Sequence, residues 1–247
     1  MHKKNLLITG ASGKLGRAIL LKGIPDRNIL TPSHQELDIT NKKSVEDYFN
    51  NHNIDENIHC AAIASVLKCE QDPNKAILTN SIGTAHLIEA SSKKNSPRFI
   101  YISTDYVYPC ENGPYKETDR TSPFTLYAFT KLGGELVTRS LKNHCIIRTS
   151  FFDPSNIPFD TAFTDSYCSK LPIYEVAEAV IKLLKSNFVG VINVGGERIS
   201  LYNLYKKYKP QIKPDSMLNT KDQIKRAKDS SLDITLWKNL KGKLNGD

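Results

Sequence analysis

Tyr127 and Lys131 are the side chains of this sequence best suited to moving a proton. They are four residues apart, and in a helix positions i and i+4 share a face, so the phenol would lie near the ammonium group. A nearby cation favours the phenolate and lowers the pKa of a tyrosine from about 10 toward neutrality, which makes the hydroxyl a usable proton donor. Any helix can contain a tyrosine and a lysine at this spacing, so the pair needs support from other residues.

Hydroxyl groups follow an apolar run at residues 99–102, which is predicted to be a strand. Ser103 and Thr104 would then lie at the carboxyl edge of a parallel sheet, where open α/β folds bind their ligands. A hydroxyl group at that edge can polarise the carbonyl group of a substrate. These two residues therefore support a carbonyl as the group on which Tyr127 acts.

A glycine-rich turn follows the first apolar run, residues 6–8. Gly10 permits a tight turn, Gly13 lets the backbone approach a pyrophosphate, and Gly16 allows the following helix to pack closely on the sheet, while the helix N-terminus stabilises the anion. The alternative is an ordinary turn between a strand and a helix, but the context that the dinucleotide fingerprint requires is present. A dinucleotide turn, a hydroxyl at a strand end and a later Tyr-Lys pair, in this order, predict hydride transfer.

Short apolar runs alternate with amphipathic stretches in the first half of the chain, as in β-α units that build a parallel sheet. We expect a Rossmann-like, doubly wound α/β fold, with a dinucleotide-binding core of residues 1–150 and a small, trimmed substrate lobe of residues 151–247 that is interleaved with the core. The predicted strands are residues 5–9, 28–30, 57–60, 98–103, 145–149 and 189–194. The predicted helices are residues 14–22, 42–51, 74–94, 123–140, 175–186 and 201–208, with residues 151–170 as a loop region.

Composition excludes several other classes of protein. The chain has 247 residues, 39% of them hydrophobic, and its apolar runs are far shorter than the roughly 18 residues that cross a bilayer. No secretory signal follows the basic start, so we expect a cytoplasmic protein. Five cysteines without a C-x-x-C pair indicate neither a disulfide framework nor a metal site. The net charge of +8 lies mostly in residues 200–247, which we interpret as a solvated face, so no nucleic-acid partner is expected.

The three motifs are accompanied by further stretches that together resemble a known family. These are residues 103–109 (STDYVYP), 114–119 (PYKETD), 127–131 (YAFTK) and 148–150 (RTS), and more loosely 34–40 (HQELDIT) and 60–62 (CAA). They resemble the dTDP-4-dehydrorhamnose reductases, which are extended short-chain dehydrogenase/reductases. The resemblance implies that Tyr127 donates a proton to the C4 keto oxygen, that Lys131 holds the nicotinamide ribose and tunes Tyr127, and that Thr104 hydrogen-bonds the keto oxygen.

The resemblance also predicts which residues contact the two ligands. Cofactor contacts are predicted at Gly10, Ser12, Gly13, Lys14, Leu15, Gly16, Asp38, Ile39, Cys60, Ala61, Ala62, Ser103, Tyr127 and Lys131. Substrate contacts are predicted at Thr104, Asp105, Tyr106, Tyr127 and Phe151. Nucleotide-sugar dehydratases typically have a glutamate where this chain has Tyr106, which favours reduction over elimination.

The implied function is reduction of the 4-keto group of a nucleoside-diphosphate 4-keto-6-deoxy sugar for deoxysugar and surface-glycan synthesis. NADPH or NADH would be the cofactor, and NADPH is favoured because residues 30–34 (LTPSH), which close the second strand, contain hydroxyls but no acid. The segment after Ser150 is shorter than is usual in the family, which leaves the substrate open. The alternatives are a non-catalytic NAD(P)-binding regulatory subunit, such as that of methionine adenosyltransferase, and an epimerase or reductase of another nucleotide sugar. A homodimer is also left open.

Overall fold

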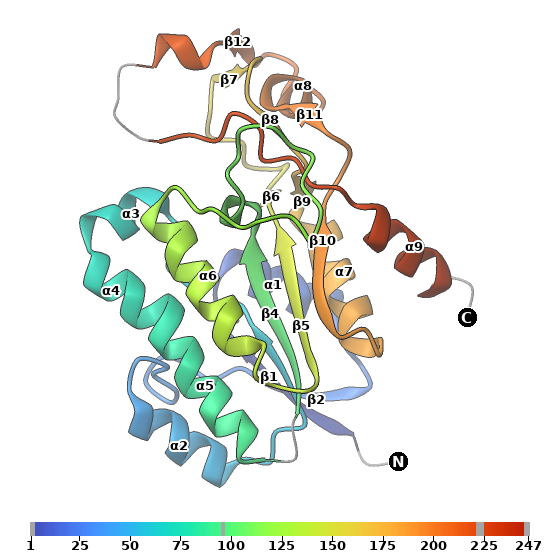
Figure 1. Cartoon of the computed structure of the whole chain (residues 1–247). Helices are drawn as coiled ribbons and strands as arrows, with labels where there is room; N and C mark the ends of the chain where they lie inside the picture. The colour runs from blue at the N-terminus through green and yellow to red at the C-terminus, as the bar shows by residue number, and fades with distance from the viewer. Residues whose placement is uncertain (1–2, 95–96, 221–224, 245–247) are drawn as a thin grey trace.

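The computed structural model describes residues 3–94, 97–220 and 225–244, and its centre is a parallel sheet of six strands in the order β10-β5-β4-β3-β1-β2 (Figure 1). The strands of this sheet are β1 (Lys4–Thr9), β2 (Arg27–Leu30), β3 (Glu56–His59), β4 (Arg98–Thr104), β5 (His144–Thr149) and β10 (Gly190–Val194). All six overlap the predicted strands, and the doubly wound α/β fold is confirmed. Runs rich in Ile, Leu and Phe suit these strands, because helices cover both faces of a parallel sheet.

The strand order reverses between β1 and β3. From β1 the chain first adds β2 on one side and then returns to add β3 on the other side of β1. At such a switch point the connections leave the carboxyl ends of the two strands in opposite directions, and a crevice opens between them. Gly10 follows β1 and Cys60 follows β3, so both predicted cofactor residues lie at this crevice.

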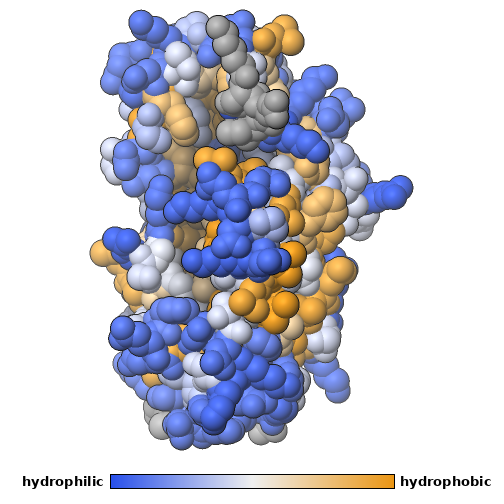
Figure 2. All heavy atoms as spheres, turned by 90° about the vertical axis from the view of Figure 1, so that its left-hand side faces the viewer, coloured by the Kyte–Doolittle hydropathy of each residue, from blue (hydrophilic) through white to orange (hydrophobic). Residues whose placement is uncertain are grey.

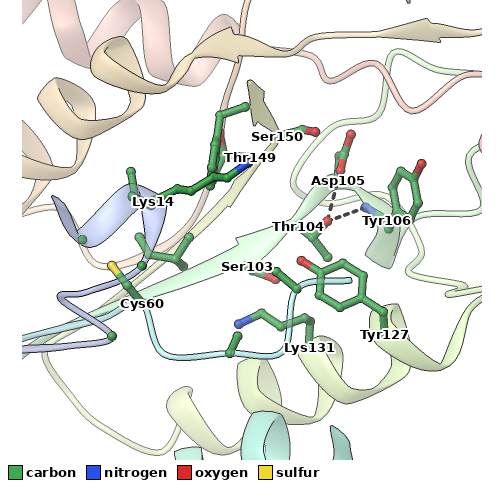
Figure 3. Close-up of a pocket in the computed structure, with 18 of the residues that line it drawn as sticks. Lys14, Cys60, Ser103, Thr104, Asp105, Tyr106, Tyr127, Lys131, Thr149 and Ser150 are labelled. Carbon is green, nitrogen blue, oxygen red and sulfur yellow. Dashed lines mark hydrogen bonds between the residues drawn. The ribbon is translucent and has the colours of Figure 1, made fainter. Parts of the chain in front are cut away.

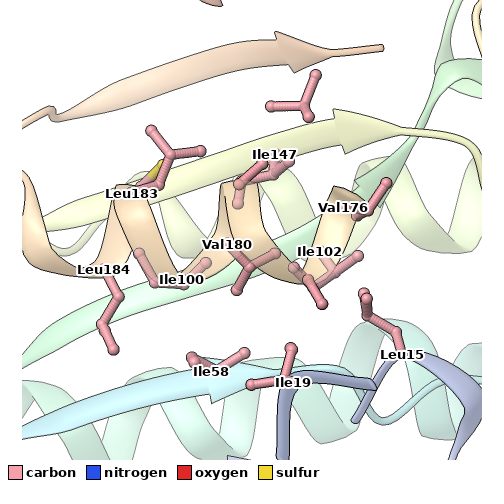
Figure 4. Packing of buried hydrophobic residues seen from close by; sticks show 14 of the residues in the cluster. Leu15, Ile19, Ile58, Ile100, Ile102, Ile147, Val176, Val180, Leu183 and Leu184 are labelled. Atoms are coloured by element: carbon pink, nitrogen blue, oxygen red, sulfur yellow. The ribbon is translucent and has the colours of Figure 1, made fainter. Parts of the chain in front are cut away.

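Helices α1 (Lys14–Lys22) and α7 (Ile173–Lys185) cover one face of the sheet. Figure 4 shows how α7 contributes Val176, Val180 and Leu183, which pack against isoleucines of the strands and against α1. The other face is covered by α2 (Lys42–Asn51), α5 (Gly83–Ser92) and α6 (Leu126–Thr138) (Figure 1). Successive strand residues point to opposite faces, so Leu6 and Ile8 belong to the first core while Leu7 belongs to the second.

The predicted helix 74–94 is wrong as a single element. The structure has α3 (Val66–Gln71), α4 (Pro73–Ile77), a π-helical turn η1 (Leu78–Ile82) and then α5. Asp72 starts α4 by accepting a hydrogen bond from the Lys75 backbone N–H at 3.0 Å. Within η1, buried Asn80 donates to the Thr130 hydroxyl at 2.9 Å and accepts from the Ile63 backbone N–H at 2.8 Å. These contacts hold the widened turn against α6, which a helical period alone does not reveal.

The region 151–170, predicted as a loop, contains short strands that pair with later parts of the chain. Three two-stranded pieces and helix α8 (Leu201–Lys206) lie above the carboxyl ends of the central strands (Figure 1). The remaining elements are β6 (Phe151–Phe152), β7 (Thr161–Phe163), β8 (Tyr167–Cys168), β9 (Leu171–Pro172), β11 (Ile199–Ser200), α8 (Leu201–Lys206), β12 (Lys213–Asp215), and the 3-10 turns η2 (Asp105–Val107) and η3 (Met217–Asn219), followed by α9 (Thr235–Leu244). Trp237 of α9 is only 5% exposed and packs in the first core, so it anchors the C-terminal helix to the body of the protein.

A buried ion pair joins α6 to the sheet. The guanidinium of Arg148 in β5 donates to both carboxylate oxygens of Glu135 in α6, at 2.9 and 2.7 Å, and the two side chains are 1% and 0% exposed. Ser103 of β4 donates to the same carboxylate at 2.6 Å, and Arg148 also donates to the Tyr108 hydroxyl at 2.8 Å. This network fixes the position of α6 over β4 and β5.

The surface formed by α3, α4, η1 and α6 is mixed in polarity. Figure 2 shows hydrophobic side chains across the middle of this face, on both sides of a band of hydrophilic ones. The exposed large apolar residues of these elements are Leu67, Ile77, Leu78, Ile82, Phe129 and Leu136. Within the described ranges, no helix combines the length and the apolar character needed to cross a membrane.

We expect the variant Arg148→Met to lower the free energy of unfolding by about 3–5 kcal/mol, because it leaves the Glu135 carboxylate buried without its partner. The double variant Arg148→Met/Glu135→Leu should recover much of this loss, since it removes both charges. Urea denaturation measures both, with Lys43→Met as the control, because its pair with Asp47 is exposed and should contribute little to stability. A loss below about 1 kcal/mol for Arg148→Met would contradict the importance assigned to the pair.

Candidate active site

The turn between β1 and α1 requires glycine at two of its positions. Gly10 has a φ of +70°, and a Cβ atom there would lie 2.5 Å from the Ala61 backbone nitrogen across the switch point. A Cβ at Gly16 would collide with the Gly10 carbonyl oxygen. Gly13 is the N-cap of α1 and supplies no side-chain acceptor, so the first N–H groups of the helix face the crevice uncapped by a side chain. The turn thus offers an anion-binding helix N-terminus with close backbone access.

Helix α6 positions Tyr127 and Lys131, which line the same cavity as the glycine-rich turn. Thr125 is its N-cap and accepts a hydrogen bond from the Ala128 backbone N–H at 3.2 Å, which fixes the first turn at Tyr127. Lys131 follows one turn later, and its ammonium nitrogen lies 4.1 Å from the centre of the Tyr101 ring. In Figure 3 the Tyr127 phenol points toward the end of β4, where Ser103 and Thr104 lie.

Thr104 is held by a chain of hydrogen bonds. Its hydroxyl donates to one carboxylate oxygen of Asp105 at 3.1 Å and accepts from the Tyr106 backbone N–H at 3.2 Å (Figure 3). The Ser230 hydroxyl donates to the other Asp105 oxygen at 2.8 Å. Burial raises the pKa of Asp105, while Lys170 and the two hydroxyls offset part of that rise. Ser230 belongs to the C-terminal segment, so a part of the chain remote in sequence helps to orient the strand end.

Burial controls the protonation of Tyr127 and Lys131. It raises the pKa of the Tyr127 phenol, although a hydrogen bond with the Thr104 hydroxyl opposes this rise. It lowers the pKa of Lys131 from 10.5 to about 7, against the attraction of Cys60 and Glu135. The sequence-based expectation that Lys131 lowers the pKa of Tyr127 toward neutrality is therefore wrong for this pocket. Removal from water dominates the pKa of the phenol, and Lys131 is not among the main charges that act on it, so the phenol keeps its proton at neutral pH.

The predicted site residues gather around two adjoining cavities. The first, of about 420 Å³, contains the glycine-rich turn and the end of β4 together. It is lined by the predicted residues Gly10, Gly13, Lys14, Leu15, Gly16, Cys60, Ala62, Ser103, Thr104, Asp105, Tyr106, Tyr127, Lys131 and Phe151. Ser12, Ile39 and Ala61 line the second cavity, and Gly10 lines both. Figure 3 shows Lys14 extending from its turn toward Thr149 and Ser150.

Two predicted cofactor residues do not present free polar groups to these cavities. Asp38 lines neither of them, and its carboxylate accepts hydrogen bonds from the Thr40 backbone N–H and hydroxyl at 2.9 and 2.7 Å. Ser103 lines the first cavity, but its hydroxyl donates its hydrogen bond to the Glu135 carboxylate.

Cys60 also lines the first cavity. Burial raises the pKa of its thiol to about 12, so the thiol is a poor nucleophile.

The structure adds residues that the sequence reasoning missed. Lys170 lines the first cavity from a stretch predicted as loop. Glu36 lines the second cavity, where its carboxylate accepts from the Ser33 backbone N–H at 2.8 Å, so an acid does lie near the end of β2. The sequence does contain a signal for Glu36, because this residue follows β2 and open α/β folds bind ligands at the carboxyl ends of their strands. Ser230 and Lys170 carried no such signal, because only tertiary packing brings them to the site.

His59 has a structural role between the sheet and α5. It is buried in β3, where its ring nitrogens lie 2.6 Å from the Thr9 hydroxyl and 3.0 Å from the Thr84 hydroxyl. Burial lowers its pKa from 6.5 to about 3, so the ring stays neutral. It therefore connects β3 to β1 through Thr9 and to α5 through Thr84.

Comparison with known proteins identifies related chains. The family described as "RmlD substrate binding domain" matches residues 4–156. The dTDP-4-dehydrorhamnose reductase of Aggregatibacter actinomycetemcomitans is 39% identical over 151 residues, which are 59% of this chain and 51% of that relative. The corresponding enzyme of Sinorhizobium fredii is 34% identical over 148 residues, which are 59% of this chain and 50% of the relative. These alignments span about half the length of the curated relatives.

A solved structure shows that the likeness continues through the rest of the fold. The crystal structure of a dTDP-4-dehydrorhamnose reductase from Clostridium acetobutylicum superposes with a TM-score of 0.88 at 27% sequence identity. The superposition covers 95% of this chain and 92% of that one. The C-terminal elements over the sheet edge therefore belong to the shared fold.

We expect Lys131 to titrate near pH 7, which NMR of 13C-labelled lysine side chains measures directly. Lys43 is the control, because Asp47 holds its pKa above the usual 10.5. Unfolded Lys131 binds its proton up to about pH 10.5 and the folded residue only up to about 7, so the free energy of unfolding should rise between these values. Lys131→Met should flatten that rise. A Lys131 midpoint above pH 9.5 would contradict the assigned effect of burial.

Proposed function

The chain belongs to the family of the RmlD substrate binding domain, and we propose that it is an NAD(P)H-dependent reductase of the 4-keto group of a nucleoside-diphosphate 4-keto-6-deoxy sugar. One observation carries this proposal. Tyr127, Thr104 and Lys131 meet the glycine-rich turn in one cavity, so a proton donor, a carbonyl-binding hydroxyl and a dinucleotide cradle share the space that hydride transfer needs. A non-catalytic regulatory subunit would not need all three to face the same cavity.

The residues at the switch point fit a dinucleotide. The uncapped start of α1 suits a pyrophosphate, and the close backbone contacts that Gly10 and Gly16 permit hold this turn against the sheet. The second cavity continues from Gly10 toward the end of β2. A bound NADPH or NADH supplies the hydride. We propose NADPH first, because the hydroxyls of Thr31 and Ser33 line the second cavity, while Glu36 there leaves NADH as a second substrate.

The proton chemistry follows from the side chains themselves. The raised pKa of Tyr127 keeps its phenol protonated, so it can donate to the oxygen of a keto group as that oxygen gains charge. Thr104 lies beside the phenol and orients the same oxygen. Lys131, with a pKa of about 7, can carry a proton at neutral pH and stabilise the phenolate that forms. Tyr101 of β4 holds Lys131 in place, because its ring lies against the ammonium group and its hydroxyl donates to the Lys131 carbonyl at 3.1 Å.

The substrate wall favours reduction of a sugar over elimination of water. Tyr106, which lies 5.4 Å from Phe124 between ring centres, supplies a phenol where elimination would need a carboxylate base. Phe151 adds an apolar surface to the same cavity. We propose that the lobe within residues 151–247 closes the sugar side, and that the enzyme acts in the cytoplasm in deoxysugar synthesis. A homodimer stays part of this proposal, supported by the exposed apolar side chains of α4, η1 and α6.

We expect Tyr127→Phe to lower kcat by about 10²–10⁴-fold with a 4-keto-6-deoxyhexose nucleotide, because the variant lacks the proton donor but keeps the ring. NADPH oxidation followed by absorbance measures kcat, and fluorescence titration should give an unchanged Kd for NADPH. Tyr174→Phe is the control, since Tyr174 is exposed on α7 and should keep full activity. Full turnover by Tyr127→Phe would remove Tyr127 from its assigned role.

A further inference from the structure

Three lysines line the first cavity, and one of them has no place in the chemistry described so far. Lys14 belongs to the glycine-rich turn and Lys131 to the catalytic helix. Lys170 comes instead from the short link between β8 and β9, on the C-terminal side of the molecule. It therefore approaches the cavity from the elements that cover the sheet edge.

The backbone around Lys170 is fixed on both sides. Leu171 donates its N–H to the Ser150 carbonyl at 3.1 Å, where β9 pairs with β6. The Ser169 carbonyl accepts from the Gly196 N–H at 2.8 Å, and its hydroxyl accepts from the Leu232 N–H at 3.1 Å. Because these hydrogen bonds fix the backbone on both sides of Lys170, its side chain extends into the cavity from a fixed position. A fixed position favours a role in binding over that of a mobile surface charge.

The surroundings of Lys170 keep it charged. Burial opposes the charge, but Tyr205, Tyr106, Asp105 and Cys168 face the ammonium group and together raise its pKa above the usual value. Of these groups only Asp105 is a carboxylic acid, and both of its oxygens already accept hydrogen bonds from Thr104 and Ser230. Among residues 3–94, 97–220 and 225–244, no side chain forms a hydrogen bond or ion pair with the Lys170 ammonium within ordinary distance. Its donors are therefore available to a ligand in the cavity.

The position of Lys170 separates it from the cofactor cradle. Its charged and polar neighbours Asp105 and Tyr106 follow Thr104 at the end of β4, and Lys170 itself comes from the link between β8 and β9 rather than from the glycine-rich turn. A cofactor pyrophosphate would lie at the start of α1, so a second anion in this cavity has to come from the other ligand. In a nucleotide sugar the phosphate is attached at C1, across the ring from C4.

We propose that Lys170 binds the sugar-linked phosphate of a nucleoside-diphosphate sugar while Tyr127 and Thr104 hold the keto oxygen at C4. This inference rests on the proposed function for the sugar and adds the group that anchors its far side. An ammonium hydrogen bond to a phosphate oxygen is charge-assisted and fixes the ring between two points. Lys170 would thus select diphosphate-linked sugars over free keto sugars.

Calorimetric titration of the full chain with dTDP and UDP tests this assignment. We expect Lys170→Gln to weaken binding of the preferred diphosphate by about 10-fold or more, and Lys170→Arg to restore most of it. Binding of dTMP and of NADPH should change by less than about 3-fold. Lys206→Gln is the control, since Lys206 is an exposed lysine of α8 in the same lobe and should bind as the wild type does.

Three results would overturn the inference: unchanged diphosphate binding by Lys170→Gln, a parallel loss of NADPH affinity and thermal stability, or no diphosphate binding by the wild type. The parallel loss would mean that Lys170 is only a counter-ion for Asp105.

Steady-state kinetics separate this inference from the proposed function. Lys170-dependent diphosphate binding without NADPH oxidation by the wild type would refute the reductase and leave the phosphate site standing. With turnover, Lys170→Gln should raise KM about 10-fold and leave kcat within about 3-fold.

Discussion

The buried pair between Arg148 and Glu135 is the interaction on which the arrangement of the site depends. It connects β5 to α6 at the level of the sheet edge, and Ser103 joins the same carboxylate from β4. Tyr127 and Lys131 lie on the first turns of the helix that this pair holds, so their distance from Thr104 is set by it. A charge pair out of contact with water costs free energy to bury, and it is tolerable here because hydroxyl and guanidinium donors satisfy the carboxylate. The free-energy cost of burying this pair therefore arises where the positions of Tyr127 and Lys131 depend on it.

Low access to water also decides which protons are available. The pocket raises the pKa of Tyr127 and lowers that of Lys131, so a neutral phenol faces an ammonium group that is close to losing its proton. This state suits donation to a carbonyl oxygen, since the phenol is protonated before reaction and the lysine can stabilise it afterwards. Charge-pairing alone suggested the opposite shift for Tyr127. The difference arises because desolvation dominates the pKa of the phenol, while Lys131 is not among the main charges that act on it.

Local patterns were sufficient for much of the fold and for the central site residues. Alternating apolar runs located the six central strands, and the glycine spacing located the crevice, because Gly10 and Gly16 are required by contacts within a few residues or with the neighbouring strand. The helix over 74–94 was beyond such reasoning, since Asn80 widens it by reaching across to α6. Lys170 and Ser230 were equally out of reach, because residues more than sixty positions from Asp105 meet it only through tertiary packing.

The most direct test of the account follows the hydride itself. Wild-type protein would be incubated with NADPH carrying deuterium at both C4 positions of the nicotinamide and with an enzymatically generated dTDP-4-keto-6-deoxyhexose. The product sugar would be analysed by mass spectrometry. The proposed reductase should give a product heavier by one deuterium, located at C4 of the sugar. Tight binding of NADPH with no deuterium in any sugar product would contradict it and indicate a nucleotide-binding subunit without catalysis.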